Sequence, residues 1–145
     1  MVNAPYPGDA ASPKQLIQLA AAYREAAKAL LPSGKKRDQL SRAPWRLIAI
    51  HAVELYLNAA LLHFGLASTK IRNLQHNMAA RTNLAIAKGL TLRKRTVSHL
   101  ETLSTNREYL TVRYSPEVPA TISQITRLNA TLEELSEKVT RLIGA

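Results

Sequence analysis

The chain has 145 residues, 20 Lys and Arg against 10 Asp and Glu, a formal net charge of +10, and no cysteine. The length suits one domain with a sizeable core, and the 46% hydrophobic content excludes a disordered chain. Without cysteine there is no disulfide framework, thiolate metal site or thiol nucleophile, and the positive charge favours a polyanionic partner: nucleic acid first, an anionic membrane surface second.

The first predicted helix follows a short N-terminal segment. Residues 1–11 hold two Pro, a Gly and small residues, which predicts a flexible leader before a single domain over residues 12–145. Ser12 suits an N-cap and Pro13 the first helical position, so the helix starts there. Its apolar residues recur at helical spacing until Pro32-Ser33-Gly34 ends it.

The second predicted helix runs from Pro44 to about Gly65 and is apolar nearly all round. That pattern is typical of a central helix with neighbours on several sides. Polar residues interrupt it too often for a membrane span, which needs about 18–20 nearly uninterrupted apolar residues. The N-terminus also lacks the basic and apolar regions of a signal peptide. We therefore expect a soluble, cytoplasmic protein that makes no membrane contact.

Three further helices complete the predicted fold. One spans 74–88 and stops at Gly89, and a weaker apolar stripe indicates another over 92–103. Residues 106–120, with two Pro and several β-branched side chains, predict an irregular or extended link. Thr121 begins the last helix, whose apolar residues form a heptad seam that packs on the core or binds a partner protein. With no strand alternation, we predict an all-α, up-and-down bundle of about five helices.

The positive charge is concentrated in the first hundred residues, and no acid occurs between Glu54 and Glu101. We predict a face that binds phosphate groups, although a solvated surface that serves solubility is the alternative. A basic membrane helix fits less well, because the basic clusters lie in loops and turns. A helix-turn-helix that binds DNA also fits less well, because the second helix is too long and too buried to be a recognition helix. The predicted phosphate-binding residues are Lys35, Lys36, Arg37, Lys70, Arg81, Lys94 and Arg95.

A polar stripe crosses the apolar second helix. His51, Glu54 and Asn58 share one helix face. They either line a ligand site or form a buried structural network. The structural network is favoured, because such networks also bury polar residues in apolar helices. A di-metal site in a bundle needs more carboxylates and a Glu-x-x-His motif, which the chain lacks. We therefore predict no metal and no cofactor.

Two Arg–His pairs have the chemistry of metal-independent RNA cleavage, in which a base activates the 2′-hydroxyl and a cation stabilises the phosphate charge. Arg93 and His99 have Arg-x5-His spacing, and Arg72 and His76 have Arg-x3-His spacing. Six positions do not share a helix face, whereas Arg95 and His99, four positions apart, do. Such pairs also arise by chance in a basic chain.

One longer pattern adds a family resemblance. The chain reads His51-Ala-Val-Glu-Leu-Tyr-Leu-Asn-Ala-Ala-Leu-Leu-His-Phe-Gly65, then His76-Asn-Met, and later Tyr109-Leu-Thr-Val-Arg-Tyr-Ser-Pro116. Over residues 44–143 this resembles the HEPN domain, which has a Glu-Leu-x-Leu-Lys-Ala-like helix, a Gly, a His that starts the next helix, and a Tyr…Arg-Tyr-Pro link before the last helix. Asn58 stands where Lys is common in that family.

The resemblance implies a helical bundle, a homodimer, and one of two functions. Many HEPN domains are toxin or defence ribonucleases with an Arg-x4–6-His motif, and others bind nucleotide or RNA without catalysis, often beside a nucleotidyltransferase. Arg93 and His99 have the nuclease spacing, but Lys94 replaces the usual polar residue after the Arg. Members with the Tyr-Arg-Tyr link commonly lack activity.

We therefore expect a homodimeric accessory module that binds nucleotide or RNA without clear catalysis. Two alternatives remain open: a metal-independent ribonuclease using Arg93 and His99, and a protein-interaction module. A nucleotidyltransferase-type protein is the expected protein partner. The expected ligand-binding residues are His51, Glu54, Asn58, Arg72, His76, Arg113 and Tyr114.

Overall fold

The computed structural model describes residues 6–119 and 121–144, and these residues form seven α-helices and two short 3-10 helices without a strand. The predicted all-α class is confirmed. The elements in chain order are α1 (Pro13–Leu30), η1 (Leu31–Ser33), η2 (Leu40–Arg42), α2 (Ala43–His63), α3 (Ser68–Asn73), α4 (Met78–Lys88), α5 (Lys94–Thr105), α6 (Glu108–Tyr114) and α7 (Ile125–Ile143).

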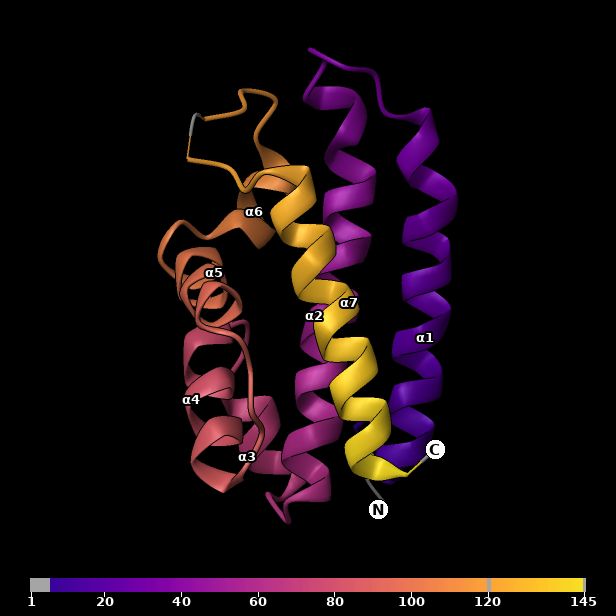
Figure 1. Cartoon of the computed structure of the whole chain (residues 1–145), viewed down its shortest axis with the longest axis vertical. Helices are drawn as coiled ribbons and strands as arrows, with labels where there is room; N and C mark the ends of the chain where they lie inside the picture. The colour runs from indigo at the N-terminus through magenta and orange to yellow at the C-terminus, as the bar shows by residue number, and fades with distance from the viewer. Residues whose placement is uncertain (1–5, 120, 145) are drawn as a thin grey trace, which may run out of the picture.

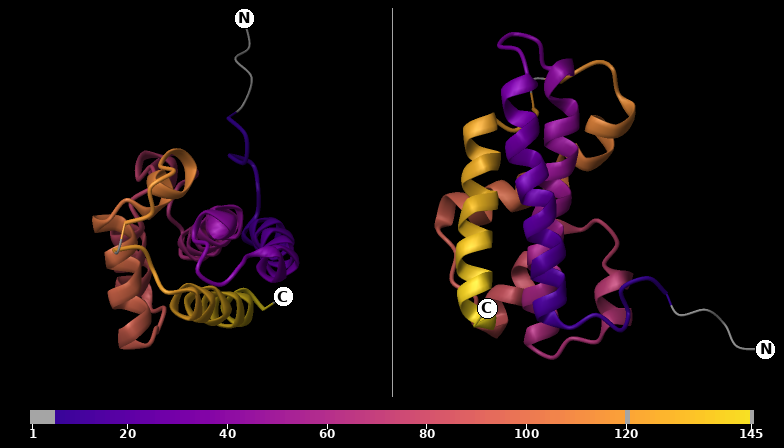
Figure 2. Two further views of the ribbon diagram at one scale, coloured as in Figure 1. Left: turned by 90° about the horizontal axis from the view of Figure 1, so that it is seen from above. Right: turned by 90° about the vertical axis from the view of Figure 1, so that its right-hand side faces the viewer.

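Helix α2 lies at the centre of the molecule. The three long helices α1, α2 and α7 run side by side along the long axis (Figure 1), and α4, α5 and α6 lie on the other side of α2 (Figure 2). Alanines at 49, 52, 59 and 60 are fully buried, so their small side chains let neighbouring helices approach α2 closely. The prediction of a central helix with neighbours on several sides is confirmed.

The stretch Leu40–His63, which includes α2, is long and apolar enough to cross a membrane by length and composition. Most of it is buried inside the bundle, and the core helix of a soluble protein has the same properties. The apolar seam of α7 is likewise used within the chain, because Leu128, Leu132, Leu135 and Val139 are all buried in the core. Of the two interpretations of the seam, packing on the core and binding a partner protein, the structure shows the first.

Two helix ends follow their predicted chemistry. Ser12 and Gln15 form a reciprocal capping box at the start of α1. Gly89 ends α4 with a φ of 124°, a conformation that side-chain-bearing residues avoid.

Two short helices were not predicted. The link after α2 contains α3, and the predicted third helix begins at Met78 rather than at residue 74, because Gln75 has a φ of 51° and Asn77 caps the next helix. Residues 106–120, predicted as irregular, contain α6, which follows the left-handed Arg107. The last helix begins at Ile125, four residues later than expected.

The N-terminal segment is docked where the structure describes it. The Asp9 carboxylate accepts two hydrogen bonds from Arg72 on α3, at 2.8 and 2.9 Å. The Tyr6 ring lies 4.1 Å from the Arg72 guanidinium carbon. Tyr6 and Asp9 of the predicted leader therefore contact the folded domain through Arg72, by cation–π and charge contacts, and the flexibility of the leader stays a prediction. Residues 1–5 of the predicted leader lie outside the described residues.

Candidate functional site

One cavity of about 280 Å³ opens beside the N-terminal half of α2. Its walls come from α1, α2, α6 and the link between α3 and α4, so it forms only when these distant segments pack together. It combines an apolar floor with aromatic, acidic and basic side chains, which is typical of a small-molecule site. The lining residues are Tyr23, Leu47, Ile48, Ile50, His51, Glu54, His76, Tyr109 and Arg113.

A carboxylate and an imidazole form the polar end of the cavity. Glu54 Oε1 lies 3.1 Å from His76 Nδ1, and the side chains are 13% and 48% exposed. The His76 ring also lies against Tyr109, with ring centroids 4.7 Å apart and planes tilted by 32°. Thus α2 supplies the acid, and the short link before α4 brings the predicted His76 to it. Glu54, an acid within an apolar helix, thus has a polar partner in the folded chain.

His51 lies one helical turn before Glu54 and is partly buried. Its ring meets Tyr23 of α1 edge to face, with centroids 4.6 Å apart. Burial lowers the pKa of His51, and the positive charge of Arg113 lowers it further, while Glu54 acts in the opposite direction. His51 is therefore neutral at pH 7 and can donate or accept a hydrogen bond without adding charge.

Arg113 supplies the exposed cation of the cavity. It lies in the last turn of α6 and forms no ion pair with any described residue. Its neighbour Tyr114 is 74% exposed and does not line the cavity. Of the two residues predicted from the Arg-Tyr pair, the structure brings only Arg113 to the site.

Asn58 and Arg81 form a structural link instead of a binding surface. Arg81 is 2% exposed, and its Nε donates a 2.7 Å hydrogen bond to Asn58 Oδ1, which ties α4 to α2. A second guanidinium nitrogen donates to the Asn77 carbonyl. The prediction that Arg81 binds phosphate is wrong, because its guanidinium is enclosed and already bonded. Asn58, likewise engaged, does not line the cavity.

Arg72 is also taken up inside the chain. It holds Asp9 and Tyr6, as described above, and it does not line the cavity. The predicted pairing of Arg72 with His76 is therefore not formed, because the two side chains turn to different partners.

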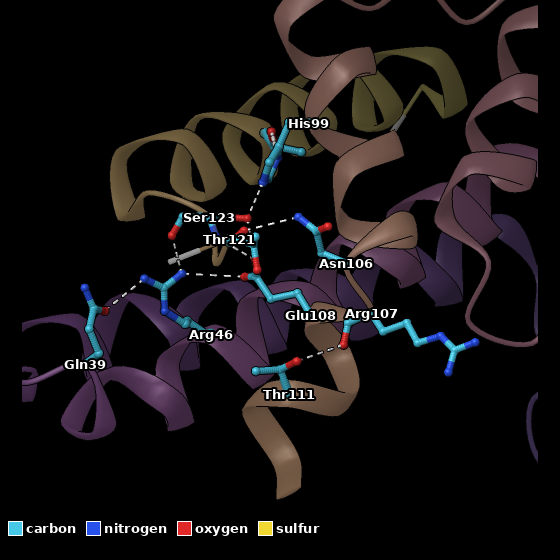
Figure 3. A network of polar contacts seen from close by, with 10 residues as sticks. Gln39, Arg46, His99, Asn106, Arg107, Glu108, Thr111, Thr121 and Ser123 are labelled. Atoms are coloured by element: carbon cyan, nitrogen blue, oxygen red, sulfur yellow. Dashed lines mark hydrogen bonds and ion pairs between the residues drawn. The ribbon is translucent and has the colours of Figure 1, made fainter. Parts of the chain in front are cut away.

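A second polar cluster lies near the start of α2 and is closed to solvent (Figure 3). Arg46 is 1% exposed, donates to the Ser123 carbonyl at 2.6 Å and faces Glu108 at 3.5 Å. Glu108 Oε1 accepts hydrogen bonds from the Ser123 backbone N–H and hydroxyl. Burial lowers the pKa of Arg46, and the Glu108 charge opposes that shift. Arg46 Nε and Glu108 Oε2 have no hydrogen-bond partner among the described residues.

His99, the predicted catalytic base, belongs to this closed cluster. It is 6% exposed, with Nε2 at 2.8 Å from Ser123 Oγ and Nδ1 at 2.7 Å from Thr131 Oγ1. Because the Ser123 hydroxyl donates to Glu108, we assign the His99 proton to Nε2, with Thr131 donating to Nδ1. Burial, together with the positive charge of Arg127, lowers the pKa of His99 to about 4. Both ring nitrogens are engaged, so neither is free to take a proton from a substrate.

Arg93 does not meet His99. It is the exposed N-cap residue of α5, where its backbone N–H donates to Glu134 Oε2 at 2.8 Å. The neighbouring Lys94 and Arg95 are exposed as well. The structure thus separates a surface guanidinium from an interior imidazole, and the predicted nuclease pair is not assembled within the chain.

The exposed members of the predicted phosphate-binding set lie on three separate segments, of which the start of α5 holds Lys94 and Arg95. Lys35, Lys36 and Arg37 occupy the link between η1 and η2 at one end of the bundle, whereas Lys70 lies on α3 near the other end (Figure 1). Helix α2 separates them with its 21 residues, a length of about 30 Å. All the predicted lysines are exposed, but they do not form one continuous patch with Arg37.

Two aromatic residues of the cavity were not predicted from the sequence. Tyr109 stood in the motif that carried the family resemblance, so its position near Arg113 was a usable signal. Tyr23 looked like one of the regular core positions of the first helix, and only the packing of α1 on α2 reveals its place in the wall. Among the described residues, no group of three or more His, Asp or Glu is placed to hold a metal ion.

Comparisons with models of protein families, with curated proteins and with solved structures found no match for this chain. The site's own geometry therefore carries the functional argument.

Proposed function

We propose that the chain is a HEPN-like helical accessory module that binds nucleotide or RNA without catalysing its cleavage. The observation that carries the proposal is the α2 cavity. It joins His51, Glu54, His76 and Arg113, residues that lie far apart in the sequence, around one opening of about 280 Å³.

The cavity has the complementary chemistry for one nucleotide unit. A flat base can lie against the apolar floor and the Tyr109–His76 pair, because base–aromatic stacking is favourable and tolerates every base. Glu54 and His51 offer hydrogen bonds to the edge of the base. The guanidinium of Arg113 suits a phosphate, which it can bind through two parallel hydrogen bonds.

The state of the two Arg–His pairs supports binding without cleavage. His99 is enclosed with both nitrogens bonded, and Arg72 is held by Asp9. Neither pair offers a free base beside a free cation, and metal-independent RNA cleavage needs both.

The proposal includes three further expectations from the sequence: a homodimer and a nucleotidyltransferase-type protein partner, which rest on the resemblance, and a cytoplasmic location. Light scattering over a wide concentration range tests the first. A homodimer has twice the chain mass of 16.0 kDa, and a monomer at every concentration would remove this part of the proposal.

Thermal unfolding with added ligand tests nucleotide binding. A ligand at about 100 times its Kd stabilises the folded state by about 2.7 kcal/mol, so AMP, GMP, CMP or UMP should raise the Tm measurably. Arg113→Ala should reduce the shift, whereas Arg141→Ala, an exposed arginine on α7, should not. If neither a nucleotide nor a short single-stranded RNA changes the Tm, the proposed function is wrong.

A further inference from the structure

The geometry of the α2 cavity points to guanine as the base it selects: we infer that Glu54 accepts hydrogen bonds from the N1–H and N2–H donors of guanine, while Arg113 at the rim binds the phosphate. This inference rests on the proposed function and specifies its ligand.

Glu54 keeps acceptor capacity for a ligand on both carboxylate oxygens, because each oxygen has two lone pairs and only Oε1 has a partner within the chain. Its Oε1 lies 3.1 Å from His76 Nδ1, and no described residue donates a hydrogen bond to Oε2. The side chain is only 13% exposed, so an incoming donor meets it with little competition from water. An ionised carboxylate only accepts hydrogen bonds, so its best partner presents donors side by side.

Guanine is the base whose pairing edge presents two adjacent donors. Adenine and cytosine each place an amino donor beside an acceptor nitrogen, and uracil places its single N–H between two carbonyl oxygens. Each of these acceptors would face the lone pairs of Glu54, which is repulsive in a partly desolvated site. Electrostatics at Glu54 therefore favours guanine over the three other bases.

The other lining residues set the orientation of the bound unit. The Tyr109–His76 pair and the apolar residues of α2 provide a surface for the purine ring. Glu54 repels a phosphate from the polar end, whereas the exposed Arg113 attracts one at the rim. His51 is held neutral by burial and so does not draw the phosphate inward. The base therefore enters first and the phosphate stays outside.

A guanylate unit can come from a free mononucleotide or from single-stranded RNA, and both present the same base edge and phosphate. The test therefore uses GMP, and the trinucleotides UGU and UAU, as separate probes. Tighter binding of UGU than of GMP would identify RNA as the source, and equal or weaker binding would identify the mononucleotide.

Calorimetric titration of the full chain measures the preference. GMP should bind about tenfold or more tightly than AMP, CMP or UMP, because hydrogen bonds to a charged group are worth at least that factor. IMP, which keeps N1–H but lacks the 2-amino group, should bind with an intermediate Kd. Inorganic phosphate alone should bind more weakly than all the nucleotides.

Glu54→Gln tests the residue that carries the selection. The amide should cut the preference for GMP over AMP to less than about threefold, because it replaces one acceptor oxygen with a donor. Glu101→Gln, at an exposed position of α5, is the matched control and should leave the preference unchanged. Circular dichroism of both variants checks that they fold.

These outcomes distinguish a failure of the guanine inference from a failure of the proposed function. If the four nucleotides bind the unaltered chain equally, or if AMP binds best, the guanine inference is overturned and the proposed function stands. If no nucleotide and neither trinucleotide binds, both fail. The unaltered chain decides these outcomes even if Glu54→Gln does not fold.

Discussion

Two polar clusters lie along the same apolar helix, and they differ in one property. The cluster of Arg46, Glu108, Ser123 and His99 is closed to solvent, and its members bond mainly to one another. The cluster around Glu54 and His76 borders an open cavity and includes an arginine without an internal ion pair. Each cluster contains a carboxylate and a histidine, so residue type alone does not distinguish them.

The difference lies in which side chains can exchange partners. The pKa of His99 is lowered to about 4, mainly by burial, yet both of its ring nitrogens are bonded to Ser123 and Thr131. A perturbed pKa marks a functional site only where the group can also reach a ligand, because structural networks shift pKa values too. The half-exposed His76 can reach a ligand, whereas the enclosed His99 cannot.

Breaking the closed cluster should have the largest effect. Glu108→Ala leaves the Arg46 charge buried without its counter-charge, which should lower the free energy of unfolding by about 3–5 kcal/mol. Urea unfolding followed by tryptophan fluorescence measures it, since the single tryptophan, Trp45, is buried next to Arg46.

Replacing both charges is the control for that variant. Arg46→Met with Glu108→Leu should recover most of the lost stability, because a buried ion pair can often be exchanged for apolar residues at no net cost. A Glu108→Ala protein as stable as the unaltered chain would show that the ion pair is solvated in solution.

The pH dependence of the closed cluster should come next in size. The folded-state pKa of His99 is about 4, below its ordinary value of 6.5, so the unfolded chain binds a proton in this window that the folded chain excludes. Stability should therefore fall as the pH drops from about 6.5 to about 4, by up to about 3 kcal/mol from this group.

His99→Asn should flatten that slope, and His63→Asn, at an exposed position at the end of α2, should not. Unfolding curves at half-unit pH steps compare the three proteins. Equal slopes for the unaltered chain and His99→Asn would contradict the enclosed, neutral state of His99.

A substitution in the open cluster should affect ligand binding more than stability. His76→Ala should cost less than about 1 kcal/mol of stability, because the imidazole is half exposed and water can replace its contact with Glu54. It should nevertheless weaken nucleotide binding, since it removes the partner of Glu54 and the ring beside Tyr109. Thermal unfolding with and without GMP measures both effects, with His63→Ala as control.

The smallest expected effect is on RNA cleavage. The purified chain incubated with labelled RNA in EDTA should yield no product, and His99→Ala should change nothing, because the unaltered His99 is already enclosed. Cleavage that disappears in His99→Ala would contradict this and restore the ribonuclease alternative.

The sequence predicted the elements that local chemistry determines. The N-cap at Ser12, the glycine stop at Gly89 and the buried central helix depend on neighbouring residues and on apolar periodicity. The short helices α3 and α6 escaped prediction because each spans fewer than eight residues, too few for a periodic pattern. Their positions depend on packing against α2.

The site was predictable to the extent that its residues sit in patterned segments. His51 and Glu54 share a face of one helix, and His76 and Arg113 stood in the family-like motifs. The roles of Arg72 and Arg81 could not be predicted, because an arginine can either bind phosphate or form hydrogen bonds inside the protein. Their partners, Asp9 and Asn58, are distant in sequence. Only the folded chain shows which role each arginine has.

The enclosure of α2 by its neighbours has a consequence for hydrogen exchange. Most side chains in the middle of this helix are buried, so we expect its amides to exchange with solvent only when the whole domain unfolds. The amides of α3 and α6 can open locally, because these helices are short and lie at the periphery. Exchange rates in α2 should therefore report the global free energy of unfolding residue by residue, and a ligand in the neighbouring cavity should slow them all by the same factor.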